Sequence, residues 1–233
     1  MQMGDKGVIK STDYGVVSGK PARQIPIGTR SVTGKFAVNG TAYESSLERD
    51  FLTICAFDCK VISVVGQPVR IPFINSVGKQ RKYTPDFLVR FDDRWLKDGT
   101  LRNQLCEIKP QEALQSAQPD LLERLEAGKR FAEENSWDFK IFTEAELRTP
   151  YLTNATFLLP YRNEPWDTDK ANLLLAQLRE LDEIDIKTFM DSLFRDKWMQ
   201  AAHLPTLWAL MATFHIQTDL TLPLTPKSLI WHY

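Results

Sequence analysis

Residues 83–110 constrain most strongly what this chain can fold into. They contain a short apolar run that begins just after Asp86 and a second that leads into Glu107-Ile108-Lys109. Because Pro85 has no backbone N–H to donate, Asp86 is expected at the start or the edge of a strand. Residues two apart share a face of a strand, so Glu107 and Lys109 are expected to point the same way. Burying these two charges inside a sheet is costly unless another group compensates.

A divalent metal ion with its bound water would compensate both charges. Carboxylate oxygens suit Mg²⁺ or Mn²⁺, and two ions roughly 3.5–4 Å apart can activate water for phosphodiester hydrolysis. Asp86 with Glu107 and Lys109 fits the PD…ExK arrangement of metal-dependent nucleases. In that role Lys109 would orient or deprotonate the attacking water, which requires its pKa to fall. The alternative is a turn capped by Asp86 and a surface pair of Glu107 with Lys109, and spacing does not decide between them.

Glu48 is a third acidic candidate. Ser45-x-x-Glu48 fits a capping box and predicts a helix that starts near Ser45, ahead of the sheet. Such a helix could carry the Glu48 carboxylate to the same metal site. The alternative is that Glu48 only accepts a hydrogen bond from the Ser45 backbone N–H, and this also stays open.

The pattern along the chain predicts an α/β sandwich with a small mixed sheet. We expect strands over 60–65, 67–75, 83–91, 104–109 and 138–142, a long helix over 119–135 and a brief one over 144–148. Three prolines within 150–165 predict a linker. Helical patterns over 167–182, 186–199 and 204–213, followed by an alternating segment over 214–222, predict a mainly helical winged-helix domain.

Charge is unevenly distributed along the 233 residues, although the net charge is only −1. Residues 1–40 hold six basic and two acidic residues, whereas residues 164–233 hold six basic and ten acidic ones. A basic arm of this kind suits phosphate contact, and a solvated tail is the alternative. Further candidate phosphate contacts, each of which could equally be a solvated surface charge, are Lys79, Arg81, Lys82, Lys129 and Arg130.

The composition of the chain disfavours several other classes of protein. Three cysteines without a signal peptide indicate a reducing compartment, and no apolar run approaches the roughly 18 residues that span a bilayer. We therefore expect a soluble, cytoplasmic protein that does not contact a membrane. The absence of a glycine-rich phosphate loop gives no support to nucleotide hydrolysis.

Taken together, several motifs resemble the TnsA family, the endonuclease subunit of heteromeric, Tn-seven-like bacterial transposases. The resemblance rests on Ser-Leu-Glu-Arg-Asp-Phe at 46–51, Tyr-Thr-Pro-Asp-Phe-Leu-Val at 83–89, Glu-Ile-Lys-Pro at 107–110 and Trp-Asp-Phe-Lys-Ile-Phe-Thr-Glu at 137–144. It covers roughly residues 40–150, with the motifs in the right order.

The resemblance implies a restriction-endonuclease-like domain over 41–150 and a winged-helix domain over 165–233, which follow the basic arm over 1–40 that the charge distribution indicates. It implies cleavage of DNA at the 5′ ends of a transposon, on the non-transferred strands, while a TnsB-type transposase cuts the 3′ ends. It also implies contact with a TnsC-type AAA+ regulator through residues 165–233 in a bacterial cytoplasm.

Carried over by position, the resemblance assigns catalytic roles to Glu48, Asp86, Glu107 and Lys109. It implies two Mg²⁺ or Mn²⁺ ions, held by the three carboxylates and the backbone carbonyl of Ile108. Two other functions stay open. A non-catalytic adaptor would bridge the transposase and its regulator, and a stand-alone restriction or resolvase-type nuclease would cut DNA unaided.

Overall fold

The computed structural model describes residues 34–97, 99 and 101–232, which fall into two compact units. The first unit comprises the described residues up to Leu52 together with Cys59–Glu144, and the second comprises Thr53–Asp58 and the residues from Ala145 onward. Most of the expected basic arm, residues 1–33, lies outside the described residues. The described remainder contains β1 (Gly34–Lys35), which pairs antiparallel with β2 (Ala42–Tyr43).

A four-stranded mixed sheet forms the centre of the first unit, as the sequence predicts. Its order is β3 (Val61–Gly66), β6 (Phe87–Phe91), β7 (Gln104–Ile108) and β8 (Asp138–Phe142). The first two pairings are antiparallel, whereas β7 and β8 run parallel. A parallel pair needs a crossover connection, and α3 (Gln111–Gln115) and α4 (Pro119–Glu134) provide it.

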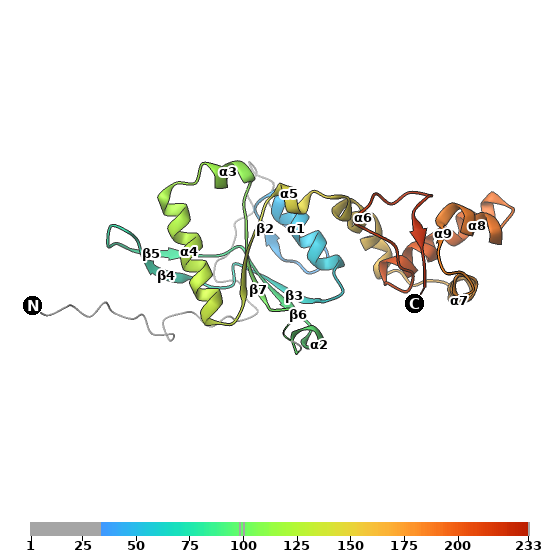
Figure 1. Ribbon diagram of the computed structural model, residues 1–233, viewed down its shortest axis with the longest axis horizontal. Coiled ribbons are helices and arrows are strands. Elements are labelled where there is room, and N and C mark those ends of the chain that lie inside the picture. The colour runs from blue at the N-terminus through green and yellow to red at the C-terminus, as the bar shows by residue number, and fades with distance from the viewer. Residues whose placement is uncertain (1–33, 98, 100, 233) are drawn as a thin grey trace, which may run out of the picture. The chain divides into compact units, whose positions relative to one another are not determined.

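Helices cover both faces of this sheet: α1 (Ser46–Phe57) lies on one side and α4 on the other (Figure 1). On the α1 side, the Phe51 ring packs 5.3 Å from that of Phe87 and 5.1 Å from that of Phe142. On the α4 side, the buried cluster includes Leu88, Leu105 and Phe131. The sheet is therefore apolar on both faces, which makes the charged residues at the end of β7 conspicuous.

Gly128 of α4 permits an unusually close approach to the helix. A Cβ atom at this position would lie 2.7 Å from the rings of both Tyr83 and Phe139. Because such a distance is far below van der Waals contact, no larger residue fits here without displacing one of the two rings. The glycine thus lets Tyr83 lie directly against the helix, in the region where the candidate site is built.

The strand predicted over 83–91 is interrupted in the structure. Residues Gln80–Tyr83 form β5, the chain leaves strand geometry at residues 84–86, and β6 begins at Phe87. Pro85 cannot donate to a ladder, which explains the break. β5 pairs with β4 (Ile71–Ile74) in a separate two-stranded sheet, and the following loop contains the short helix α2 (Asp93–Leu96).

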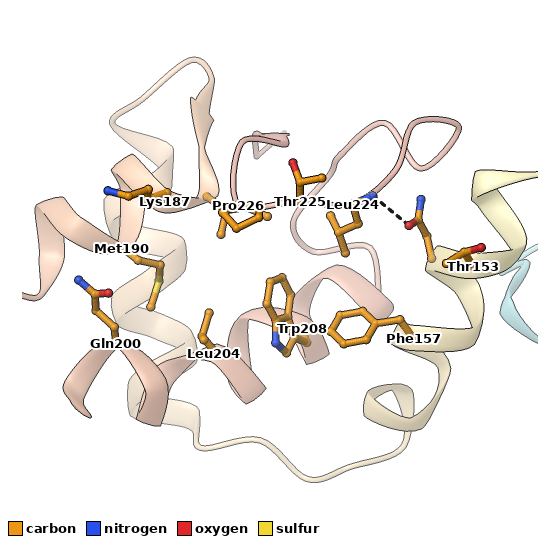
Figure 2. A pocket seen from close by; sticks show the side chains of 12 residues that line it. Thr153, Phe157, Lys187, Met190, Gln200, Leu204, Trp208, Leu224, Thr225 and Pro226 are labelled. Carbon is orange, nitrogen blue, oxygen red and sulfur yellow. Dashed lines mark hydrogen bonds between the residues drawn. The ribbon is translucent and has the colours of Figure 1, made fainter. Parts of the chain in front are cut away.

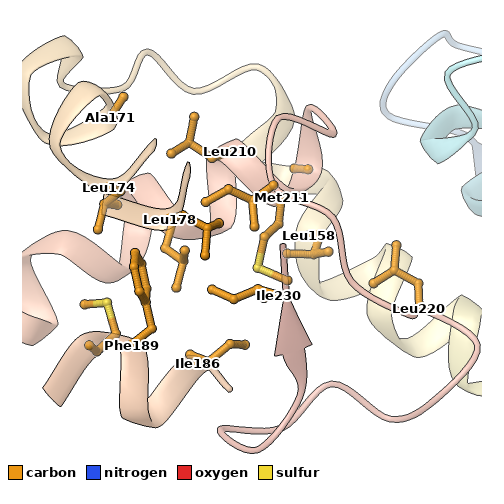
Figure 3. Packing of buried hydrophobic residues seen from close by; sticks show 14 of the residues in the cluster. Leu158, Ala171, Leu174, Leu178, Ile186, Phe189, Leu210, Met211, Leu220 and Ile230 are labelled. Carbon is orange, nitrogen blue, oxygen red and sulfur yellow. The ribbon is translucent and has the colours of Figure 1, made fainter. Parts of the chain in front are cut away.

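The second unit is mainly helical and packs around its own apolar cluster, which includes Leu174, Phe189 and Leu210 (Figure 3). Its elements are α5 (Glu144–Leu147, at the unit boundary), α6 (Pro150–Leu158), the 3-10 helix η2 (Leu159–Arg162), α7 (Thr168–Arg179), β9 (Ile184–Asp185), α8 (Ile186–Leu193), α9 (Lys197–Ala212) and β10 (Leu229–Ile230). None of the helices in the described part of the chain combines the length and the apolar character needed to cross a bilayer.

Two predictions about the second unit are wrong. The linker predicted over 150–165 is largely helical, because Pro150 occupies the first turn of α6, where a missing N–H costs nothing. The predicted helices 186–199 and 204–213 are divided differently, since Asp196 accepts from the Trp198 N–H and starts α9 there. That helix then continues through Pro205.

The alternating segment 214–222 does not form a regular strand. Its β contact is at Gln217, whose backbone exchanges hydrogen bonds of 2.9 and 3.1 Å with Trp231. Asn154 of α6 holds the rest in place: its Nδ2 donates to the carbonyls of Leu220 and Leu222, and its Oδ1 accepts from Leu224 N–H. Side-chain bonds thus replace the ladder that the pattern indicated.

Candidate active site

Asp86 lies in the break between β5 and β6, beside the end of β7. Its Oδ2 accepts a hydrogen bond of 2.8 Å from the backbone N–H of Ile108. Its own carbonyl accepts from the backbone N–H of Gln67 at 2.7 Å. The main chains of two neighbouring segments therefore fix the position of Asp86, which does not act as the turn cap that the sequence left open.

Glu107 and Lys109 meet Asp86 at the end of β7. The Glu107 residue is only 3% exposed. The Lys109 ammonium lies 2.8 Å from Glu107 Oε1 and 3.6 Å from Asp86 Oδ2, and it also donates to the carbonyl of Ile108 at 3.2 Å. The two carboxylates therefore converge on one cation, and the alternative of a surface pair does not hold for the buried Glu107.

Tyr83 is a site residue that sequence reasoning missed. Its hydroxyl donates a 2.6 Å hydrogen bond to Glu107 Oε2, so that each oxygen of this carboxylate has its own donor. The Tyr83 side chain is buried against Gly128 of α4. The useful signal was its position at the start of the strand predicted over 83–91, three residues before Asp86, but only the fold shows that β5 ends beside β7.

Gln67 is a second residue that sequence reasoning did not select. It is buried and has a left-handed backbone with φ of 47°, which is uncommon for a residue other than glycine. Among the described residues, its Oε1 is the buried side-chain oxygen without a hydrogen-bond partner. Strain and an unpaired polar atom beside Asp86 are features that gather at functional sites.

Glu48 lies at the start of α1 with its carboxylate committed to the helix end. Oε2 accepts from the backbone N–H of Glu44 at 2.9 Å, and Oε1 accepts from the Ser45 hydroxyl at 3.0 Å. The Ser45 hydroxyl oxygen in turn accepts from Glu48 N–H. The capping interaction is thus present, but it reaches Glu44 rather than the expected Ser45 N–H. Glu48 nevertheless influences the site electrostatically, since its charge raises the pKa of Asp86.

Burial and crowding perturb the titration of the site. The pKa of Asp86 is raised to about 7, first by desolvation and then by the neighbouring Glu107 carboxylate, although Lys109 opposes the shift. Burial alone would lower the pKa of Lys109, but Asp86 and Glu107 outweigh it and the pKa is raised. Lys109 is therefore an ammonium in this arrangement, whereas a role as a base would require a lowered pKa.

The raised pKa of Asp86 makes stability depend on pH in the absence of metal. A carboxyl whose pKa is higher in the folded state favours folding below its unfolded value, and this contribution is lost as the pH rises toward about 7. Asp86→Asn mimics the protonated carboxyl, so this variant does not lose the stabilising contribution as the pH rises. With a chelator present, we expect it to raise the free energy of unfolding at pH 8 by roughly 1–3 kcal/mol.

Urea unfolding of both proteins at pH 4 and pH 8 checks this expectation. The difference should shrink toward pH 4, where the wild-type carboxyl is largely protonated in both states. Asp120→Asn is the control, because Asp120 is exposed on α4. A gain of equal size at both pH values would contradict the assigned cause.

The donor set suits a divalent cation. Three carboxylates, Glu48, Asp86 and Glu107, influence a site that holds one ammonium, so negative charge is in surplus. No described residue donates a hydrogen bond to Asp86 Oδ1. Within the same residues, no three His, Cys, Asp or Glu side chains form a ready metal-binding group. The fit is therefore to a cation held by Asp86 and Glu107, and Glu48 would have to leave its capping bonds to join them.

The candidate phosphate contacts lie on two elements of the first unit. Lys79, Arg81 and Lys82 are exposed along the β4–β5 hairpin, and Lys129 and Arg130 are exposed on α4. A separate apolar pocket of about 500 Å³ lies in the second unit, where it is lined by Phe157, Trp208 and Leu224, among others (Figure 2). None of the candidate catalytic residues lines this pocket.

Comparison with known families agrees with this geometry. Residues 58–144 match the model described as TnsA-like endonuclease N terminal, and residues 146–220 match that described as TnsA endonuclease C terminal. The first match contains Asp86, Glu107 and Lys109, whereas Glu48 precedes it. A search of curated proteins found no match.

Proposed function

Because the chain belongs to the TnsA family and is the endonuclease subunit of a transposase, we propose that it cuts DNA at the 5′ ends of a transposon, on the non-transferred strands. The reaction is hydrolysis of a phosphodiester bond. A TnsB-type transposase cuts the 3′ ends in the same assembly. The observation that carries the proposal is the convergence of Asp86 and Glu107 on the Lys109 ammonium.

Mg²⁺ or Mn²⁺ bound at Asp86 and Glu107 would supply charge neutralisation at the phosphate and an activated water. Glu48 and the carbonyl of Ile108 are the additional ligands that we propose for a pair of ions. The residues themselves orient the reaction. Tyr83 and Lys109 hold the Glu107 carboxylate from its two oxygens, and the Ile108 N–H holds Asp86.

Lys109 acts in this proposal as a cation and a hydrogen-bond donor. Its raised pKa keeps it protonated, which suits stabilisation of negative charge on the phosphate rather than removal of a proton. The DNA contacts proposed around the site come from Lys79, Arg81, Lys82, Lys129 and Arg130, which are exposed basic residues of the same unit.

We propose a winged-helix architecture and a partner-binding role for residues 165–233. The order α7, β9, α8, α9 and β10, with β9 paired to β10 and Gln217 paired to Trp231, supports that architecture. A TnsC-type AAA+ regulator is the partner proposed for this region. The apolar pocket of the second unit provides a surface on which such a contact could rest.

The experiment combines the purified full chain with the partner transposase, the regulator and DNA that carries labelled transposon ends. We expect 5′-end cuts in Mg²⁺ and none in a chelator. Cuts that persist in the chelator would contradict the metal dependence. An assembly that completes 3′ cleavage but never cuts the 5′ ends would contradict the function itself.

The same assay separates the two alternatives. A stand-alone nuclease cuts its preferred DNA without the partner proteins. A non-catalytic adaptor tolerates Lys109→Ala, although it loses transposition when residues 165–233 are removed. The buried charges at Glu107 and Lys109 favour the enzyme, since an adaptor gains nothing from keeping charge inside a sheet.

A further inference from the structure

We propose that the β4–β5 hairpin is a DNA-binding ribbon that lies in a groove of the duplex next to the cleavage site. The proposal deepens the endonuclease function and rests on it for the identity of the ligand. The ribbon comprises residues 71–83: β4, β5 and the turn between them. It is separate from the four-stranded sheet, and apart from Tyr83 at its base it contributes no residue to the catalytic cluster.

Charge identifies the ligand as a polyanion. Residues 67–83 contain four basic residues and no acidic residue, in a chain whose net charge is −1. Lys79, Arg81 and Lys82 are exposed, and none of them forms an ion pair with another residue that the structure describes. A row of free cations on an exposed ribbon is suited to contact the phosphate backbone of DNA.

The shape of the ribbon indicates that it binds in a groove of duplex DNA. The major groove of B-DNA admits a two-stranded β-ribbon. The loop end of the ribbon lies away from the four-stranded sheet (Figure 1), and Val77 in that loop is 71% exposed. Ile74, the last residue of β4, is 56% exposed. Apolar side chains at the tip of a basic ribbon can contact base edges, for example thymine methyl groups, where charged ones could not.

The ribbon is preformed rather than loose. In the turn, Asn75 N–H donates to the Lys79 carbonyl at 3.0 Å, and the Asn75 side chain accepts from Lys79 N–H at 2.7 Å. Gly78 supplies the positive φ of 75° that this turn requires. Ser76 N–H donates to Glu123 of α4 at 3.1 Å, which ties the loop to the body of the unit. A rigid element loses little entropy on binding.

Its base joins the ribbon to the catalytic cluster. Tyr83 is the last residue of β5, and its hydroxyl is bonded to Glu107. The six residues from Tyr83 to Val77 span at most about 20 Å of extended chain. At 3.4 Å of rise for each base pair, contacts of the ribbon fall within about six base pairs of the scissile phosphate.

Binding of the full chain to a labelled random-sequence duplex in a chelator tests the proposal without cleavage. The variant Lys79→Ala/Lys82→Ala should lower the slope of log affinity against log salt by about two, one for each lost phosphate contact. The matched control is Lys97→Ala/Lys140→Ala, two exposed lysines outside the ribbon, which should leave the slope unchanged. Thermal unfolding verifies that all variants are folded.

The tip is tested separately. Val77→Ser should weaken binding about fivefold without changing the salt slope, because it removes an apolar contact and no charge. Ile62→Ser is its control, since Ile62 is 62% exposed on β3. The proposal would be overturned if the ribbon variants and the control variants changed duplex affinity equally, or if neither changed it. It would also be overturned if the unaltered chain did not bind the duplex. An unaffected affinity would point to a protein partner for the ribbon.

The outcome is distinguishable from that of the proposed function. If the complete assembly cuts 5′ ends while the ribbon variants bind duplex like the unaltered chain, the ribbon proposal fails and the endonuclease stands. If the ribbon variants lose binding but the assembly never cuts those ends, the ribbon stands and the endonuclease proposal fails.

Discussion

Asp86→Ala should lower the rate of 5′-end cleavage in the reconstituted assembly by about 10³-fold or more, while the partner's 3′ cleavage continues. The reason is geometric. Asp86 is positioned by two backbone contacts and shares the Lys109 ammonium with Glu107, so its removal leaves one carboxylate of the pair. The measurement is single-turnover cleavage of DNA labelled separately on the two strands.

Two controls make this result specific. Continued 3′ cleavage shows that the variant still assembles with its partners. Asp86→Asn keeps the size of the side chain and an acceptor for the Ile108 N–H, and it should be equally inactive because it cannot carry negative charge. If Asp86→Ala still cut the 5′ ends at the wild-type rate, the assignment of the active site would be wrong.

The local part of the site could be predicted from the sequence. The two-residue period of a strand correctly placed Glu107 and Lys109 on one face, and Pro85 correctly put Asp86 at a strand start. The helix that starts after Ser45 followed from its capping pattern. These inferences needed only neighbours along the chain, and the mixed sheet and the long helix α4 of the first unit follow from the same kind of pattern.

The rest of the site depends on how segments that are distant in the sequence lie against one another, and no local sequence pattern determines that arrangement. Tyr83 contacts Glu107 only because β5 ends beside β7, and Gly128 makes room for the ring from a third element. The capping pattern at Glu48 also had two possible outcomes, and only the structure shows that its carboxylate bonds to the N–H of Glu44.

Two predictions that involved prolines of the second unit were wrong. Pro150 was interpreted as part of a linker, yet it begins α6, because the first turn of a helix needs no N–H from it. A helix was expected to start near Pro205, yet α9 runs through it from Lys197. A proline limits its own hydrogen bonding, but surrounding packing decides whether the helix continues.

Lys109→Met should have two linked effects that separate catalysis from packing. It removes the cation between Asp86 and Glu107 but keeps most of the side-chain volume. In a chelator at pH 8, the two uncompensated carboxylates should lower the free energy of unfolding by about 2–4 kcal/mol. In the assembly, loss of the ammonium should slow 5′ cleavage by about 10²-fold.

The double variant Lys109→Met/Asp86→Asn shows whether charge causes the instability. With only one carboxylate left at the centre, most of the lost stability should return, whereas cleavage should remain absent. Lowering the pH should also restore part of the stability of Lys109→Met, because the pKa of Asp86 is already raised and protonation removes its charge.

A non-catalytic adaptor would give a different combination of stability and transposition. It would show the same instability of Lys109→Met, since the burial of the charges is a property of the fold, but transposition would proceed once the protein was stabilised by Asp86→Asn. An enzyme cannot be rescued by that second substitution, because the residue that restores the fold is itself part of the site. Stability that returns without cleavage therefore assigns Asp86 and Lys109 together to the chemistry, and stability that returns together with cleavage assigns both residues to the packing at the end of β7.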